Sequence, residues 1–247
     1  IAAAYFFLFS SLAMTQSSNP FGIPSEESPT PAANVVVASG SRAQGWLGQG
    51  RSEVIARHGI VATSDTLAAP AGLEVLQKGG NAIDAAVAAG AVLDVTSQND
   101  TGIAGDLFAL VYIAEENKLY ALNSAGWAPS GWTPDFFKND LNLESVPSAG
   151  VNAATVPGAI SGYDALLQRF GTLGFKETFD RAARIADEGW GQGERRHRDL
   201  VSSENKLRND EYSAEVFFEN ARAPDLYKII KNPDLANALR LIQDRKS

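Results

Sequence analysis

The stretch 76-LQKGGNAIDAAVAAGAVLDV-95 contains the strongest structural signals in this chain. Apolar residues within 66–78 recur at helical spacing and predict a helix. Gly79 stands where a left-handed residue would end that helix. Asn81, with Asp84 three residues later, has the pattern of a capping box at the start of a new helix. The stretch therefore predicts a helix end, a tight turn and a second helix.

The second helix is predicted to be built from very small side chains, in 85-AAVAAGA-91. Gly90 would weaken an isolated helix, so helix propensity alone does not explain the pattern. Small side chains do allow another backbone to lie very close. We expect this helix to be pressed against a sheet or another helix in a buried layer.

The remaining patterns indicate a mixed fold. Residues 59–64 read as a short strand, and 107–113 and 119–123 as a hairpin around the polar turn 114–118. An exposed loop, 124–135, is expected to follow. A turn and a helix are predicted within 155–173, with Ile160, Tyr163, Leu166, Leu167 and Phe170 facing inward, and further helices at about 176–188, 194–208, 212–220 and 234–245. The predicted class is α/β (α+β), with a helix-rich C-terminal part.

Composition excludes several classes of function. The 247 residues are 45% hydrophobic and 20% charged, enough for a sizeable core. The formal charge of −8 argues against a nucleic-acid partner. The basic cluster 195-RRHR-198 is flanked by acidic residues, and we interpret it as a solvated helix face rather than an anion site. Cysteine is absent, which rules out disulfides and Cys nucleophiles, and two widely separated histidines, His58 and His197, do not indicate a metal site.

The two ends of the sequence are interpreted as processed or cut. Residues 1–13 are apolar but short, and read as a truncated signal peptide rather than a stable membrane anchor. Residues 14–50, which include a stretch rich in Ser, Pro and Glu, are predicted to be a flexible linker. Residues 51–247 are interpreted as one partial domain, truncated at its C-terminus. This organisation predicts a periplasmic or secreted protein.

Short motifs alone do not identify a reaction. Asp100-Thr101-Gly102 matches the aspartic protease tripeptide, but that chemistry needs two such carboxylates and one copy is present. The glycines of 45–50 lack the preceding strand and the Lys-Ser/Thr of a phosphate loop, so a linker is favoured. Asn99 begins a glycosylation sequon, which matters only in a eukaryotic secretory route.

Several ordered segments together resemble the γ-glutamyltransferase (glutathione hydrolase) family, over roughly residues 51–245. The Gly-Gly-Asn-Ala-x-Asp-Ala-Ala block at 79–86 is the most characteristic, and 102–112, 155–173, 182–190 and 233–242 agree in order. The resemblance implies part of an αββα sandwich of the N-terminal-nucleophile hydrolases. It implies a precursor protein that cleaves itself into a large and a small subunit. It also implies a freed N-terminal Thr as nucleophile, beyond Ser247, and no metal or organic cofactor. The implied substrate is a small-molecule γ-glutamyl amide.

The chain departs from the family where a substrate would bind. Family members carry an Arg for the glutamate α-carboxylate, at the position of Ala125 or, in a divergent branch, of Trp127. Trp127 is interpreted either as lining an apolar acyl pocket or as a partly buried loop tryptophan. Asp106, in a Gly-x-Gly-Asp-like pattern, is expected to orient its loop or to meet a substrate amine. The alternatives are therefore an acylase-like relative with a non-glutamyl substrate, and a non-catalytic envelope binding protein.

Overall fold

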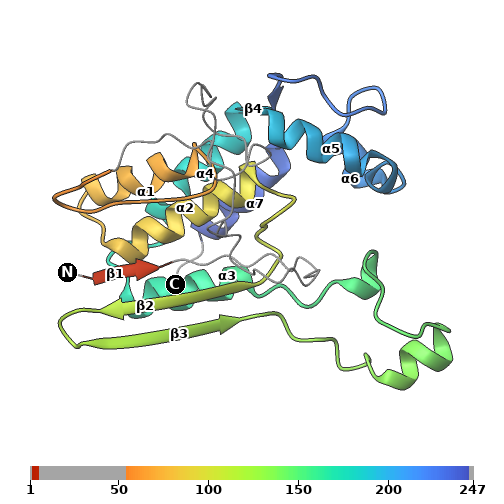
Figure 1. The fold of residues 1–247 in the computed structure, drawn as a ribbon, viewed down its shortest axis with the longest axis horizontal. Coiled ribbons are helices and arrows are strands. Elements are labelled where there is room, and N and C mark those ends of the chain that lie inside the picture. The colour runs from red at the N-terminus through yellow and green to blue at the C-terminus, as the bar shows by residue number, and fades with distance from the viewer. Residues whose placement is uncertain (1, 6–53, 245–247) are drawn as a thin grey trace, which may run out of the picture. The chain divides into compact units, whose positions relative to one another are not determined.

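The computed structural model describes residues 2–5 and 54–244. Contacts divide the chain into two units, Ile1–Phe9 with Gly59–Ser247, here called the main unit, and Ser10–His58. All that follows concerns the main unit (Figure 1). Its elements in chain order are β1 (Ala2–Tyr5), α1 (Ala68–Gln77), α2 (Ala82–Thr96), β2 (Leu107–Ile113), β3 (Lys118–Ser124), a π-helical turn (Phe136–Asp140), a 3-10 turn (Val151–Ala153), α3 (Ala159–Phe170), α4 (Phe175–Glu188), β4 (Trp190–Gly191), α5 (Glu194–Leu207), α6 (Glu211–Phe217), β5 (Ile229–Ile230) and α7 (Pro233–Gln243).

The turn between α1 and α2 forms as predicted. Gly79 has φ +93°, a left-handed conformation that suits glycine. The Asn81 side chain accepts hydrogen bonds from the backbone N–H groups of Ile83 and Asp84, and Asp84 accepts from the Asn81 N–H, which closes a capping box. The prediction of helix end, turn and capped helix is confirmed.

Asp84 does more than cap α2. Its side chain is fully buried, and it accepts hydrogen bonds from Thr172 N, Thr172 Oγ1 and Leu173 N at 2.6–3.2 Å. The Asn81 Nδ2 donates to the Phe170 carbonyl at 2.6 Å. The start of α2 is thereby tied to the turn between α3 and α4, and these bonds satisfy the buried Asp84 carboxylate and the half-buried Asn81 amide.

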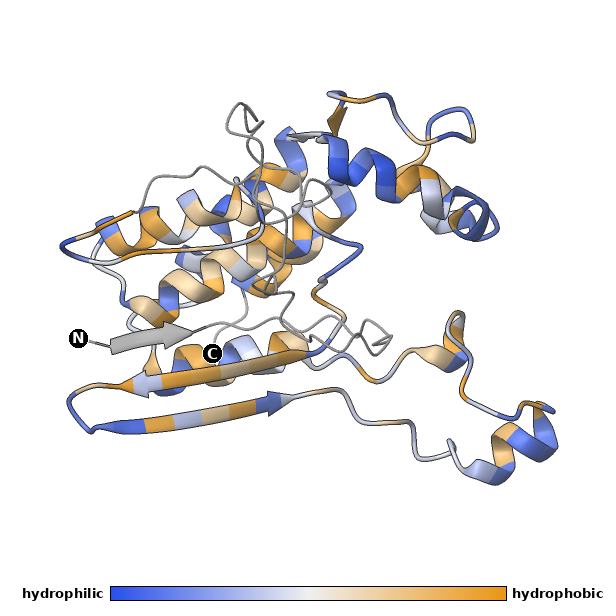
Figure 2. Cartoon of the chain, in the orientation of Figure 1, coloured by the Kyte–Doolittle hydropathy of each residue, from blue (hydrophilic) through white to orange (hydrophobic). Residues whose placement is uncertain are grey.

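Close packing around α2 is also confirmed. Thirteen of its residues are buried, and the helix packs beside α1, α3 and α4 (Figures 1 and 2). At Gly90 a Cβ atom would lie 2.7 Å from the Tyr163 hydroxyl and 3.2 Å from its ring. Tyr163 is 1% exposed, so its ring occupies space that only a glycine leaves open.

The hairpin of β2 and β3 has the predicted extent within one residue. The two strands pair antiparallel from Leu107↔Ser124 to Ile113↔Lys118, and β1 pairs antiparallel with β2 on the other side. Leu107, Ala109 and Val111 are buried and face the helices, whereas Leu110 is exposed. This alternation is what a sheet with one covered face requires.

The predicted C-terminal helices are all present, and α4 packs against α7. The inward face of α3 is confirmed, because Tyr163, Leu166 and Leu167 are buried and Ile160 and Phe170 pack against the same core. By contrast α5 buries no residue and is mostly hydrophilic (Figure 2).

One predicted strand is missing from the structure, and one predicted loop has slightly different bounds. Residues 59–64 form no strand; the backbone is irregular, although Val61 packs against the core. The predicted loop 124–135 is largely confirmed, since residues 125–133 are irregular, but Ser124 belongs to β3 and the chain then stays irregular up to α3 apart from the two short turns. The linker 14–50, with its glycine-rich 45–50, lies outside the described residues. Of the predicted signal peptide 1–13, residues 2–5 form β1 and the others lie outside the described residues.

In the described part of the chain, no helix combines the length and the apolar character needed to cross a bilayer.

Candidate functional site

Three segments meet at the open end of the hairpin, and we call this place the junction. They are Gly105–Asp106 before β2, residues 124–127 after β3, and residues 155–158 before α3. Because Leu107 pairs with Ser124, the residues just outside the sheet, Asp106 and Ala125, are adjacent in space. All three residues singled out from the sequence, Asp106, Ala125 and Trp127, therefore lie at the junction.

Backbone hydrogen bonds hold the junction together. The Gly105 carbonyl accepts from Gly158 N at 3.0 Å and from Ala159 N at 2.8 Å. These are N–H groups at the start of α3, which have no partner within the helix. The Trp127 carbonyl accepts from Val156 N at 3.0 Å. Each of the three segments is thus bonded to another.

Glycines allow these segments to approach so closely. A Cβ atom at Gly126 would lie 1.7 Å from the Val156 carbonyl oxygen, and one at Gly158 would lie 2.2 Å from the Ser124 carbonyl oxygen. No side chain fits at such distances. A larger residue at either position would therefore force the loops apart.

Asp106 orients the loop that follows β3. Its Oδ1 accepts a hydrogen bond from Gly126 N at 2.8 Å, and the residue is exposed. Among the described residues, Oδ2 has no hydrogen-bond partner. This hydrogen bond agrees with the expectation that Asp106 orients its loop, and it leaves Oδ2 as an acceptor without a partner among the described residues.

The other two predicted positions are also exposed. The Ala125 N–H donates to Asn123 Oδ1 at 3.0 Å, so the turn is held by side chain and backbone together. Trp127 is 85% exposed. The interpretation of Trp127 as a partly buried loop tryptophan is wrong, and its indole is available to a ligand or to another part of the protein.

Two serines at the junction were not identified from the sequence. The hydroxyls of Ser124 and Ser161 both donate to the Gly158 carbonyl, at 2.8 and 2.7 Å, and their oxygens lie 3.2 Å apart. Serines are common in loops, and no local pattern marked this pair. They satisfy a carbonyl near the start of α3 and fix the end of β3 against it.

The junction has a single type of charge. Its three segments and the first turn of α3 contain Asp106 but neither Lys nor Arg. A carboxylate would find no ion-pair partner from these segments. A cation or a hydrogen-bond donor would find an acceptor at Asp106 Oδ2.

The loop that leads to Asp106 begins at the end of α2, beside the N-terminal part of α5. Asp100 accepts hydrogen bonds from Arg195 Nη2 at 3.0 Å and from Arg196 Nη1 at 3.2 Å. Arg196 is only 16% exposed, so its interpretation as part of a solvated helix face is wrong. Asp100 belongs to the protease-like tripeptide, and these ion pairs give it a structural partner.

A buried carboxyl group, that of Asp94, lies in the last turn of α2. Asp94 is 4% exposed and accepts a hydrogen bond from the Tyr163 hydroxyl at 3.0 Å. Burial raises the pKa of Asp94 to about 7, and hydrogen bonds from Tyr163 and Thr101 oppose this shift. Burial and the neighbouring Asp94 together raise the pKa of Tyr163 well above its usual value. Asp94 thus connects α2, α3 and the loop.

Other features of the described residues do not coincide with the junction. An open cavity of about 530 Å³ lies between α5 and residues 220–225 and is lined by side chains of both charges. Within residues 54–244, His, Asp and Glu side chains form no group of three that could hold a metal ion.

Comparison with known proteins gives a consistent family. The sequence model described as Gamma-glutamyltranspeptidase matches residues 68–246. The glutathione hydrolase-like YwrD proenzyme of Bacillus subtilis is 31% identical over 78% of this chain and 36% of its own length. A glutathione hydrolase proenzyme of the same organism is 32% identical over 77% of this chain and 33% of its own length. The chain thus spans about a third of the length of these relatives.

Solved structures agree with the sequence comparisons. The γ-glutamyltranspeptidase of Helicobacter pylori is 30% identical with a TM-score of 0.73, over 78% of this chain and 56% of that one. A cephalosporin acylase from Bacillus halodurans is 31% identical with a TM-score of 0.70, over 79% of this chain and 38% of that one. The predicted fold class, a mixed α/β part of an N-terminal-nucleophile hydrolase, is confirmed by these neighbours. Since the matching model covers well over half of its residues, the chain belongs to the γ-glutamyltranspeptidase family and represents part of the large subunit.

Proposed function

We propose that the protein to which these residues belong is a γ-glutamyl amidohydrolase, acting on small γ-glutamyl amides such as glutathione. The observation that carries the proposal is the similarity, at 30–32% identity, to proteins named glutathione hydrolases in a bacterium and a plant. The enzyme would be made as a precursor that cuts itself. This chain would belong to its large subunit, and the small subunit would come from the same precursor.

The proposed reaction needs no metal or organic cofactor. A Thr beyond Ser247, freed as the N-terminus of the small subunit, attacks the γ-carbonyl carbon, and its own α-amine takes the hydroxyl proton. The amide C–N bond then breaks, the leaving amine receives that proton, and a γ-glutamyl ester remains on the Thr. Water or an amino-acid amine cleaves the ester and regenerates the hydroxyl.

In this proposal the junction forms part of the substrate side of the site. Asp106 would accept a hydrogen bond from the substrate α-ammonium through Oδ2, while Oδ1 holds the loop at Gly126. Ala125 and Trp127 supply no cation, so the α-carboxylate would need a basic group from elsewhere in the protein. The exposed Trp127 indole would instead contact an apolar part of the substrate. We propose secretion or a periplasmic location, which the apolar segment 1–13 favours.

The test is to express the full-length protein and follow both cleavage and activity. We expect two chains after purification, and hydrolysis of a γ-glutamyl anilide at least tenfold faster than of a simple acyl anilide. A matched variant with the processing Thr changed to Ala should remain one chain and be inactive. A protein that cleaves itself but prefers the simple acyl anilide as substrate would instead support the acylase-like alternative. An uncut protein that hydrolyses neither anilide would instead support the alternative of a non-catalytic binding protein.

A further inference from the structure

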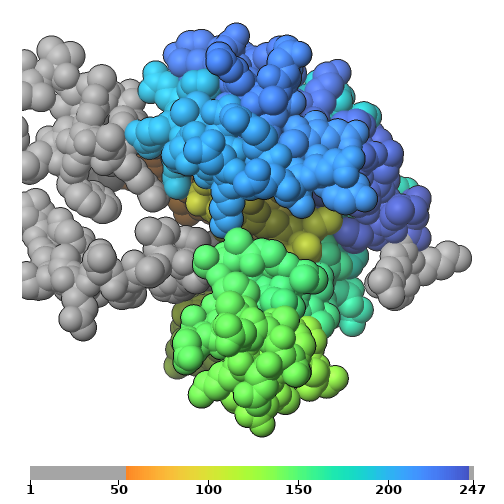
Figure 3. Space-filling model, turned by 90° about the vertical axis from the view of Figure 1, so that its right-hand side faces the viewer, coloured from red at the N-terminus to blue at the C-terminus, as the bar shows by residue number. Residues whose placement is uncertain are grey.

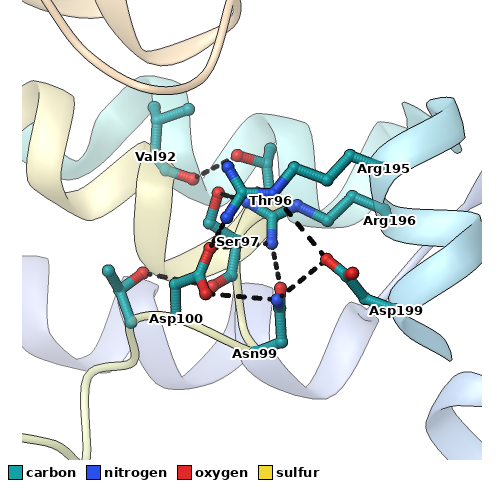
Figure 4. A network of polar contacts seen from close by, with 9 residues as sticks. Val92, Thr96, Ser97, Asn99, Asp100, Arg195, Arg196 and Asp199 are labelled. Carbon is teal, nitrogen blue, oxygen red and sulfur yellow. Dashed lines mark hydrogen bonds and ion pairs between the residues drawn. The ribbon is translucent and has the colours of Figure 1, made fainter. Parts of the chain in front are cut away.

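The N-terminal turn of α5 holds the loop that leads to the junction. Arg195 and Arg196 both bind Asp100, at 3.0 and 3.2 Å, and Arg196 also contacts Asn99 Oδ1 and Ser97 Oγ. Both guanidinium groups extend from α5 toward the end of α2 (Figure 4). We call Asp100, Arg195 and Arg196 the clamp. In the space-filling view the end of α2 and its loop, in yellow, lie beneath α5, in blue (Figure 3).

The clamp acts on a loop that is already compact at this end. Asp100 N and Thr101 N both donate to the Ser97 carbonyl, at 2.8 and 3.0 Å, directly after α2 ends. The C-terminus of a helix carries a partial negative charge, and a guanidinium beside it is favourable. The two arginines therefore neutralise both the helix end and the Asp100 carboxylate.

The other end of the same loop is the junction. Gly105 N donates to the Gly102 carbonyl at 2.9 Å, so a turn separates the clamp from Gly105 and Asp106. Only four residues, 101–104, separate Asp100 from Gly105, whose carbonyl accepts hydrogen bonds from the start of α3. A shift in the position of Asp100 should therefore also shift Asp106, because the connecting segment is short.

We propose that Asp100 is a positioning residue: held by Arg195 and Arg196, it fixes where Asp106 meets Gly126 at the junction. Through Asp100, α5 would therefore influence the geometry of the candidate substrate site, although α5 buries no residue of its own. The inference rests on the proposed function only where it assigns a substrate to the junction. The clamp itself is partly exposed, with side chains 16–40% accessible, so salt should weaken it.

The first experiment measures backbone hydrogen exchange in the full-length protein, resolved to single residues. The variant is Asp100→Asn, and the control is Glu204→Gln, which removes a partly exposed ion pair between α5 and its C-cap residue Arg208. We expect the Gly126 amide, which donates to Asp106, to exchange about tenfold faster in Asp100→Asn. Amides in the middle of α4 should not change, and the control should match the wild type at both places.

The outcomes divide clearly. Equal Gly126 exchange in Asp100→Asn and Glu204→Gln would overturn the proposal. Faster exchange throughout the protein would also overturn it, since that is a general loss of stability. If Asp100→Asn does not fold, Arg195→Lys serves instead, because it keeps the charge and loses the planar guanidinium contact. Its Gly126 exchange should rise about threefold, and no rise would reject the clamp.

The second experiment separates the clamp from the proposed reaction. Steady-state rates on a γ-glutamyl anilide should show a KM raised about fivefold in Asp100→Asn, with kcat changed less than twofold, and no change in Glu204→Gln. A wild-type protein without this activity would reject the proposed function and leave the exchange result intact. An active wild type whose KM is unaffected by Asp100→Asn would reject the positioning role.

Discussion

Replacing Asp84 with Asn tests whether the buried carboxylate organises the motif at the start of α2. The two side chains have nearly the same shape, so packing is preserved and only acceptor capacity changes. Oδ2 of Asp84 accepts from Asn81 N and Thr172 Oγ1, and Oδ1 accepts from Thr172 N and Leu173 N. An Asn carries one oxygen and one NH₂ group. Whichever way it is turned, two donors face its NH₂ group instead of an oxygen.

The size of the effect follows from this count. A hydrogen bond to a charged group contributes about 1.5–3 kcal/mol, and a buried donor left unpaired costs about 1–3 kcal/mol. Thr172 is exposed, so water replaces part of the loss, and its hydroxyl can rotate to accept from the NH₂ group. We therefore expect Asp84→Asn to lower the free energy of unfolding by about 2–3 kcal/mol.

Urea denaturation followed by circular dichroism measures this difference. Asp180→Asn is the matched control, because Asp180 is about half exposed and pairs with Arg184 on the surface of α4. Such a pair contributes at most about 0.5 kcal/mol. A loss below 1 kcal/mol in Asp84→Asn, or one no larger than in the control, would refute the role given to this carboxylate.

Three further substitutions test the packing and electrostatics around α2. Gly90→Ala should lower the free energy of unfolding by about 1–3 kcal/mol, because the new methyl group would meet the Tyr163 hydroxyl. The loss should be smaller in a Tyr163→Phe background. Equal losses in the two backgrounds, measured by urea denaturation, would contradict this contact. Asp94 has its pKa raised from 3.8 to about 7, so the folded protein keeps a proton that the unfolded chain releases, and stability falls by about 4 kcal/mol as pH rises from 4 to 7 and beyond. Asp94→Asn should remove that part of the pH dependence, and parallel stability curves for the variant and the wild type would reject the assignment. At Gly79 no atom crowds a new side chain, so Gly79→Ala should cost about 1 kcal/mol from the left-handed backbone alone, with Gly79→Asn costing less in thermal unfolding.

The elements predicted correctly from the sequence are those whose signals are local. The capping box needs only Asn81 and Asp84, and the hairpin needs two alternating strands and a polar turn, all within a few residues. The strand predicted at 59–64 failed for the opposite reason. β-branched residues favour a strand only where another strand pairs with them. Val61 is instead used to cover the α1–α2 layer, a role that depends on distant residues.

The candidate site divides in the same way. Asp106, Ala125 and Trp127 were selected from the family resemblance, and the register of the predicted hairpin accounts for why Asp106 and Ala125 lie at one edge. Ser161 and Gly158 could not be placed there from the sequence, since they arrive on a helix that begins more than thirty residues after β3 ends. Their contacts depend on how α3 packs against the sheet.

The basic cluster on α5 shows how neighbours in sequence can mislead. Glu194 and Asp199 flank the arginines and suggested a self-neutralised, solvated face. Asp199 does lie 3.8 Å from Arg195, but the shorter contact, at 3.0 Å, goes to Asp100, 95 residues earlier. A charged side chain pairs with whatever the fold brings nearest, and a partly buried pair is screened less than an exposed one. The contact with Asp100, together with the hydrogen bond that Asn99 Nδ2 donates to Asp199 Oδ2 at 3.2 Å, joins α5 to the loop that leads to Asp106.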